Sequence, residues 1–133
     1  MIAPRTLRVL VVDDEPLARQ RIVDLLHREH GVEIVAEIDD GIAAVEAIRT
    51  QSPDLVFLDV TMPKLNGFDT CTAIKQDLGL TDTFVCMLTA KGQAYDRERG
   101  LEAGANLFLT KPFDPDELLA IARKALGLPT GTP

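Results

Sequence analysis

The sequence predicts an α/β fold in which helices cover both faces of a five-stranded parallel sheet. Five short apolar runs alternate along the chain with longer segments whose apolar residues recur at helical spacing. Most of these runs are continuous rather than alternating, which is typical of strands buried on both faces. Strands and helices that alternate over connections of this length imply right-handed crossovers and therefore parallel strands.

The five apolar runs are rich in Val, Ile, Leu and Phe, residues that favour strands. They are Val9–Val12, Ile34–Ala36, Leu55–Leu58, Phe84–Leu88 and Leu107–Leu109. The second run is flanked by Glu33 and Glu37, which makes it the most polar of the set. We therefore expect this strand at an edge of the sheet.

The first two helical segments begin and end at residues that favour helix boundaries. The first begins at Pro16, because proline is favoured in the first turn, and ends before Gly31. The second spans Gly41–Gln51 and ends before Ser52-Pro53. The first helix is expected to carry Leu17, Ile22, Leu25 and Leu26 on one side, and the second carries Ile42, Ala44, Val45 and Ile48.

Three further helices are expected over residues 67–76, 93–103 and 115–126. The first of them ends before Gly79, and Gly104 ends the second as a left-handed cap. Asp114 is the predicted N-cap of the last helix, with Pro115 at its first position and Glu117 three residues after the cap.

Length and composition indicate one globular domain, which we place at residues 1–127, with a tail or linker at 128–133. A chain of 133 residues has a common domain length, and 46% apolar residues argue against disorder. The formal charge of −7 argues against a nucleic-acid surface, which needs Lys and Arg to neutralise phosphates.

The chain shows no secretion or membrane signal. Its start lacks the apolar stretch of a signal peptide, and its apolar runs fall far short of the ~18–20 residues that span a bilayer. Cys71 and Cys86 are too few for a disulfide scaffold and lack metal-ligand spacing. We expect a cytoplasmic protein whose domain contacts neither membrane nor nucleic acid.

Polar side chains follow the predicted strands at their carboxyl ends, where open parallel sheets bind ligands. Asp13-Asp14-Glu15 follow the first strand, Asp59 the third, Thr89 the fourth and Thr110-Lys111 the fifth. Carboxylates gathered at one edge repel, and a divalent cation removes the repulsion. An all-oxygen ligand set suits Mg²⁺.

A lysine and a hydroxyl beside such a cation would stabilise a transferring phosphoryl group, whose charge spreads over its oxygens. An aspartate carboxylate is itself a competent nucleophile toward phosphorus. The residues therefore predict an aspartate that is phosphorylated in a Mg²⁺-dependent step.

Four motifs carry a family resemblance, at residues 11–16 (VVDDEP), 58–67 (LDVTMPKLNG), 88–90 (LTA) and 110–113 (TKPF). In this order they resemble the receiver domains of two-component response regulators, over a stretch from about Arg8 to Leu126. The resemblance implies a flavodoxin-like, doubly wound (βα)₅ sheet with strand order 2-1-3-4-5. It also implies a signalling domain without independent enzymatic turnover.

The resemblance assigns roles to individual residues. Asp59 would be the phosphoacceptor, receiving its phosphoryl group from a phosphohistidine of a sensor histidine kinase or a histidine phosphotransfer protein. The implied ligands of Mg²⁺, for which Mn²⁺ could substitute, are Asp13, Asp14, Asp59 and the backbone carbonyl of Thr61. The implied phosphate-binding groups are the Thr89 hydroxyl, Lys111, and the backbone amides of Thr61 and Ala90.

The resemblance further implies a conformational switch. Thr89 would move toward the phosphate and Phe108 would turn inward, changing the affinity of the face formed by the fourth helix, fifth strand and last helix. That face would bind a downstream protein, an output domain or a second copy of the chain. Lys111-Pro112 is expected to be a cis bond, and Gly67 is expected to allow a tight turn after the acceptor loop.

Two departures from the family pattern bear on the rate and on the switch. Thr61 and Lys91 occupy the two positions that, in the family, tune how fast the phosphoryl group is hydrolysed. This combination of threonine and lysine does not predict the hydrolysis rate. Phe108 stands where tyrosine is commoner in the family. The alternative to a switch role is that Phe108 is an ordinary aromatic residue of the strand.

Three other functions compete with a switch. A receiver can keep its fold and never be phosphorylated. Aspartate phosphatases of the haloacid dehalogenase type use the same residue types, but carry Asp-x-Asp on the first strand and a cap domain for which 133 residues leave no room. A flavodoxin-like cofactor binder would place a Ser/Thr/Gly-rich loop after the first strand, where Asp13-Asp14-Glu15-Pro16 would repel a phosphate without metal.

Other polar clusters have structural explanations. His27 and His30 suggest a metal pair, but a solvated helix end accounts for them better. Asp39-Asp40 could join the acidic site, and Asp40 is favoured as the cap of the second helix. The run at 95–99 is typical of an exposed, salt-bridged helix face.

Overall fold

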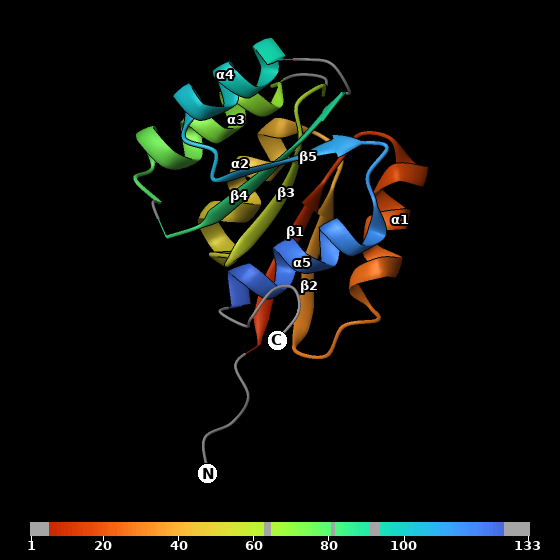
Figure 1. The fold of residues 1–133 in the computed structure, drawn as a ribbon. Helices are drawn as coiled ribbons and strands as arrows, with labels where there is room; N and C mark the ends of the chain where they lie inside the picture. The colour runs from red at the N-terminus through yellow and green to blue at the C-terminus, as the bar shows by residue number, and fades with distance from the viewer. Residues whose placement is uncertain (1–5, 63–64, 81, 91–93, 127–133) are drawn as a thin grey trace.

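Five parallel strands form the sheet of the computed structural model, which describes residues 6–62, 65–80, 82–90 and 94–126 (Figure 1). The strands are β1 (Leu7–Val12), β2 (Val32–Ile38), β3 (Leu55–Asp59), β4 (Phe84–Ala90) and β5 (Leu107–Lys111). Their order is β2-β1-β3-β4-β5, which confirms the doubly wound fold and places the polar second strand at an edge. The predicted tail at 128–133, Lys91, and the expected helix start at Gln93 lie outside the described residues.

The observed strands are longer than the apolar runs because the backbone ladder continues into polar residues. Thr89 pairs with Thr110, and Ala90 pairs with Lys111, at the carboxyl ends of β4 and β5. Asp59 is likewise the last residue of β3. Asp59, Thr89 and Lys111 are therefore fixed by strand pairing, whereas Asp13 and Asp14 follow the end of β1.

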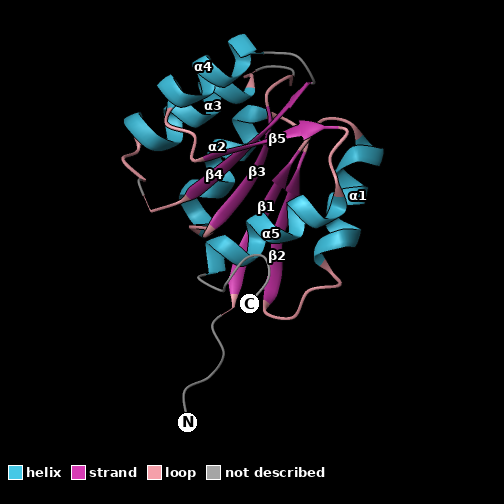
Figure 2. Ribbon diagram, in the orientation of Figure 1, coloured by secondary structure: helices cyan, strands magenta, loops and turns pink. Residues whose placement is uncertain are grey.

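Helices cover the two faces of the sheet (Figure 2). They are α1 (Pro16–Leu26), α2 (Gly41–Gln51), α3 (Gly67–Thr72), the π-helical turn η1 (Ala73–Asp77), α4 (Ala94–Ala103) and α5 (Pro115–Leu126). Helices α1 and α5 bury their apolar residues in one core with β1, β3, β4 and β5, and the remaining helices bury theirs in a second core on the other face. None of the described helices is long and apolar enough to cross a membrane.

One cysteine lies in each core. Cys86 belongs to the core under α1 and α5, and Cys71 belongs to the core on the opposite face. Both thiols are buried and free. Burial raises the pKa of Cys86 to about 12 and that of Cys71 to about 11.

Helix boundaries follow the predicted caps. The Asp40 carboxylate accepts a hydrogen bond from the Ala43 N–H at 2.8 Å, and Asp114 accepts one from the Asp116 N–H at 2.8 Å. Gly104 has a φ of 102°, as a left-handed cap requires. Asp40 therefore starts α2, as predicted.

Two of the apolar residues assigned to these helices are exposed rather than buried. Leu17 is 81% exposed and Ile42 is 58% exposed. At 3.6 residues per turn, Leu17 shares its side of α1 with Gln20, Arg21 and Asp24, while Arg19 shares the buried side with Ile22 and Val23. The predicted stripe of α1 was therefore wrong at its first residue.

The third predicted helix is divided. Its first part is α-helical, but Ala73–Asp77 forms a π-helical turn in which the Leu78 N–H donates to the Ala73 carbonyl at 2.8 Å. The Lys75 ammonium then reaches the Thr83 carbonyl. Apolar spacing did not predict this turn, because the buried residues Cys71 and Ile74 are three apart, as in an ordinary α-helix.

Candidate functional site

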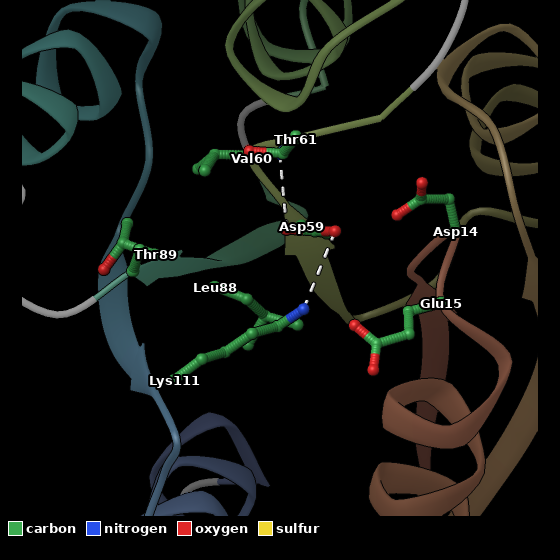
Figure 3. A pocket seen from close by; sticks show the side chains of 9 residues that line it. Asp14, Glu15, Asp59, Val60, Thr61, Leu88, Thr89 and Lys111 are labelled. Carbon is green, nitrogen blue, oxygen red and sulfur yellow. Dashed lines mark hydrogen bonds and ion pairs between the residues drawn. The ribbon is translucent and has the colours of Figure 1, made fainter.

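The predicted site residues meet at the carboxyl edge of the sheet, beside β1 and β3, where the strand order reverses. A pocket of about 490 Å³ opens there. Its lining consists of Asp14, Glu15, Asp59, Val60, Thr61, Leu88, Thr89, Ala90 and Lys111. Figure 3 shows Thr89 and Asp14 on opposite sides of Asp59, with the Lys111 ammonium pointing toward the Asp59 carboxylate.

Three carboxylates form a compact oxygen cluster in this pocket. One oxygen each of Asp13, Asp14 and Asp59 lie within 4.8 Å of one another. Asp13 is fully buried, Asp59 is 6% exposed, and Asp14 is open to solvent. In the described ranges, this is the one group of three or more acidic, His or Cys side chains close enough to share a cation. Oxygen-only donors with one solvent-facing member fit Mg²⁺, which keeps part of its water shell.

The two histidines lie apart from this acidic cluster. His27 and His30 are both exposed at the end of α1, and neither belongs to a cluster of potential metal ligands among the described residues. Their solvated position agrees with the simpler of the two interpretations.

Lys111 joins two of the carboxylates. Its Nζ lies 2.6 Å from Oδ2 of Asp13 and 3.6 Å from Oδ2 of Asp59. Burial acts to lower the pKa of Lys111, but its hydrogen bond to Asp13 and the charges of Asp59, Asp13 and Glu15 outweigh burial and raise that pKa. The ammonium therefore stays charged. The Lys111–Pro112 peptide bond is cis.

Asp59 is the carboxyl whose protonation is most altered by its surroundings. Burial, followed by the negative charge of Asp13, raises the pKa of Asp59 to about 7. The Lys111 charge and the Thr61 N–H, which donates to Oδ1 of Asp59 at 3.3 Å, act in the opposite direction without cancelling the rise. Without a bound cation, the protonated form of Asp59 is therefore favoured well above the usual pH range of an aspartate.

This shift predicts that Asp59→Asn stabilises the metal-free protein at high pH. The folded-state pKa of about 7 lies above the ordinary 3.8, so stability from this group is complete below about pH 4 and is lost as pH rises through 7. Asparagine removes the penalty. After allowance for solvent screening, we expect a gain of about 2 kcal/mol at pH 8 and none attributable to this charge near pH 4.

Urea unfolding with EDTA at several pH values measures the difference. Asp77→Asn, at an exposed residue of η1, is the matched control, and the gain in Asp59→Asn is measured relative to it. A gain in Asp59→Asn that is the same at pH 4 and pH 8 would contradict the assigned cause.

The backbone N–H, the backbone carbonyl and both carboxylate oxygens of Asp13 are all hydrogen-bonded. Its N–H donates to the Ile38 carbonyl at 3.0 Å, and its Oδ1 accepts from the Glu15 N–H at 2.9 Å. Lys111 binds its Oδ2, and Nη1 of Arg19 donates to its carbonyl oxygen at 2.7 Å. The sequence-based assignment missed Arg19. A charged residue on the apolar side of α1 was the signal that could have identified it.

Phe108 lies outside the pocket. It pairs with Met87 in the ladder between β4 and β5, two residues before Thr89, and is partly buried against the second core. The Arg97 guanidinium lies 5.2 Å from the centre of its ring, and a Cβ on Gly100 would meet that ring at 2.4 Å. Arg97 and Arg99 therefore pack on aromatic rings, those of Phe108 and Phe68, and are not simply part of a solvated charged face.

Gly67 is needed for space rather than for a left-handed turn. It is absent from the positive-φ glycines among the described residues. A Cβ on Gly67 would lie 2.3 Å from the Asp59 carbonyl oxygen and 2.7 Å from Cα of Val60. The tight turn expected here depends on close approach of the backbone: α3 begins directly against the end of β3, and only glycine permits that approach.

Comparisons with known proteins agree with this geometry. A family model for the response regulator receiver domain matches residues 9–123. The chain is 42% identical over 119 residues to the DNA-binding response regulator MtrA of Mycolicibacterium smegmatis, covering 90% of this chain and 50% of MtrA. It spans about half the length of the first curated relatives that it matches.

Two solved structures extend the comparison. The signal receiver domain of the response regulator NarL from Mycobacterium tuberculosis superposes with a TM-score of 0.86 at 32% identity, covering 93% of this chain and 98% of that one. The receiver domain of the sensor histidine kinase PA1611 from Pseudomonas aeruginosa, with a magnesium ion in its active site cleft, gives 0.78 at 30% identity, covering 92% and 98%.

Proposed function

The chain belongs to the response regulator receiver domain family, and from this premise we propose that it is a phosphorylation switch whose acceptor is Asp59. The observation that carries the proposal is the placement of this side chain: it ends β3, lines the pocket, and has the Lys111 ammonium 3.6 Å away. Receiver domains are signalling domains, and we assign this chain no independent turnover of a substrate.

The proposed donor is a phosphohistidine on a sensor histidine kinase or a histidine phosphotransfer protein. An oxygen of the Asp59 carboxylate attacks phosphorus and forms an acyl phosphate, while the P–N bond to the imidazole breaks and the imidazole leaves with a proton from solvent. The deprotonated carboxylate is the attacking form, so a lower pKa of Asp59 would increase the fraction available for transfer. A cation beside Asp59 would have that effect.

Asp13, Asp14 and Asp59 are the residues proposed to hold Mg²⁺ or Mn²⁺, together with the backbone carbonyl of Thr61. The oxygen cluster and its one solvent-facing member support this assignment. When bound, the cation would neutralise charge on the transferring phosphoryl group.

Lys111, Thr89 and the amides of Thr61 and Ala90 are the proposed phosphate-binding groups, and all four residues line the pocket. One ammonium and one bound divalent cation would balance the three carboxylates. Phosphorylation adds about one further negative charge. We propose that the Thr89 hydroxyl moves toward the phosphoryl group in response to this added negative charge.

Phosphorylation by a small acyl phosphate tests the proposal without a partner protein. The protein is incubated with acetyl phosphate and Mg²⁺, and its intact mass is measured. We expect an increase of one phosphoryl group that survives acid, is lost in alkali and does not form in EDTA. No adduct would indicate a receiver that is never phosphorylated, and rapid turnover of a phosphomonoester would indicate a phosphatase.

The proposed output is a change of the α4-β5-α5 face, through Thr89 and Phe108, that alters affinity for a downstream protein, an output domain or a second copy. The DNA-binding activity named for MtrA belongs to a protein twice as long, so we attribute no DNA contact to residues 1–127. We interpret residues 128–133 as a linker or tail on composition alone.

Phe108→Ala is expected to separate phosphorylation from the response. The adduct should form as in the wild type, because Phe108 does not line the pocket. The free energy of unfolding should fall by about 2 kcal/mol, because a partly buried ring is deleted. Phosphorylation should change hydrogen exchange of α4 and β5 in the wild type and leave it unchanged in the variant.

Phe84→Ala provides the matched loss of a partly buried ring on β4, in the core on the other face, and should keep the response. An undiminished response in Phe108→Ala would mean that this aromatic residue serves packing alone.

A further inference from the structure

Arg19 connects helix α1 to the backbone of the acidic turn. Its Nη1 donates to the Asp13 carbonyl oxygen at 2.7 Å, and its Nε lies 3.7 Å from Oε1 of Glu37 on β2. The side chain is 21% exposed, on the side of the helix that faces the sheet. A guanidinium held at two points has a defined orientation, because its donors form a rigid planar fork.

The Asp13 carbonyl belongs to a residue that is fully buried. A buried carbonyl without a hydrogen bond costs about 1–3 kcal/mol, so loss of the Arg19 contact would force the turn to shift or to admit water. Asp14, the solvent-facing member of the oxygen cluster, is bonded through its peptide to this same carbonyl. A rotation of that peptide would move the Asp14 carboxylate directly.

We infer that Arg19 is a positioning residue for the cation site. By fixing the peptide between Asp13 and Asp14, it keeps their carboxylates within reach of Asp59, where the structure has the three oxygens inside 4.8 Å. The inference rests on the proposed function, because it assumes that this cluster binds Mg²⁺.

The charge of Arg19 and its positioning role predict opposite effects on Mg²⁺ affinity. As a nearby positive charge, Arg19 repels a cation, so its neutralisation would tighten Mg²⁺ binding. As an anchor, its removal loosens the acidic turn and weakens binding. Residues that orient metal ligands commonly contribute ten- to a hundredfold to affinity. Because Arg19 acts on a backbone group, we expect the lower end, about tenfold.

The test is a calorimetric titration of the full chain with Mg²⁺ alone, at constant pH and ionic strength. Arg19→Gln is expected to raise the dissociation constant about tenfold. Arg21→Gln removes the same charge from the same helix, but Arg21 lies over the Phe113 ring at 5.4 Å, so this control should bind at least as tightly as the wild type. Arg19→Lys keeps the charge without the two-point contact and should weaken binding by an intermediate factor.

The outcomes are distinguishable. If the wild type binds Mg²⁺ and Arg19→Gln binds equally or more tightly, or if both glutamine variants weaken equally, the positioning role is overturned. If Arg19→Gln does not fold, Arg19→Lys decides, because an unchanged constant at unchanged charge also overturns the role. A wild type that does not bind Mg²⁺ would instead contradict the proposed cation site.

Discussion

Asp59→Asn should abolish the Mg²⁺-dependent phosphoryl adduct that the wild type forms with acetyl phosphate. The amide lacks the anionic oxygen that attacks phosphorus, so the rate of adduct formation should fall by more than about a hundredfold. Asp13 is unsuited to replace it because both its oxygens already accept hydrogen bonds, from Glu15 and Lys111. Intact mass measured over a time course gives the ratio of rates.

Asp69→Asn is the matched control for that experiment. It makes the same chemical change at an exposed residue in the first turn of α3, and the adduct should form at the wild-type rate. An adduct of equal extent in Asp59→Asn would place the acceptor elsewhere and end the assignment of Asp59.

Gly67→Ala is expected to cause the largest loss of stability of the substitutions considered, about 3 kcal/mol. The new methyl group would lie 2.3 Å from the Asp59 carbonyl oxygen and 2.7 Å from Cα of Val60. Both are backbone atoms, so no side-chain rotation relieves the overlap, and α3 must separate from the end of β3. Urea unfolding monitored by circular dichroism measures the change.

Gly79→Ala separates crowding from backbone conformation. Gly79 has a φ of 67°, and a methyl group at this position would have no neighbouring atom within 4 Å, so alanine there should cost only about 1 kcal/mol. A loss in Gly67→Ala no greater than that in Gly79→Ala would contradict the close approach. A stable Gly67→Ala variant with unchanged phosphorylation would contradict the expected separation of α3 from the end of β3, the strand that carries Asp59.

Much of the fold followed from the sequence because burial on both faces leaves a simple pattern. The strands of the sheet have near-continuous apolar runs, and parallel pairing brings their carboxyl ends to one edge. That geometry is enough to bring Asp13, Asp59 and Lys111 together from chain positions 98 residues apart. No side-chain detail was needed to predict the location of the pocket.

The parts that could not be predicted depend on distances between elements. Gly67 has an ordinary φ, and only its distance from β3 explains it. Leu17 follows a proline and was assigned to the apolar side, although its helical phase places it among polar residues. Arg19 was overlooked for the converse reason: a charged side chain can face the sheet when a buried carbonyl is there to accept its hydrogen bond.

The two buried thiols make the protein convenient for labelling. With pKa values of about 11 and 12 for Cys71 and Cys86, almost no thiolate is present at neutral pH, and maleimide reagents act on the thiolate. A cysteine introduced by Leu101→Cys, at a position of α4 that is 60% exposed, would be modified first without removal of either native cysteine. A fluorophore attached there would place an optical reporter on the face that is proposed to respond, in a chain that has no tryptophan of its own.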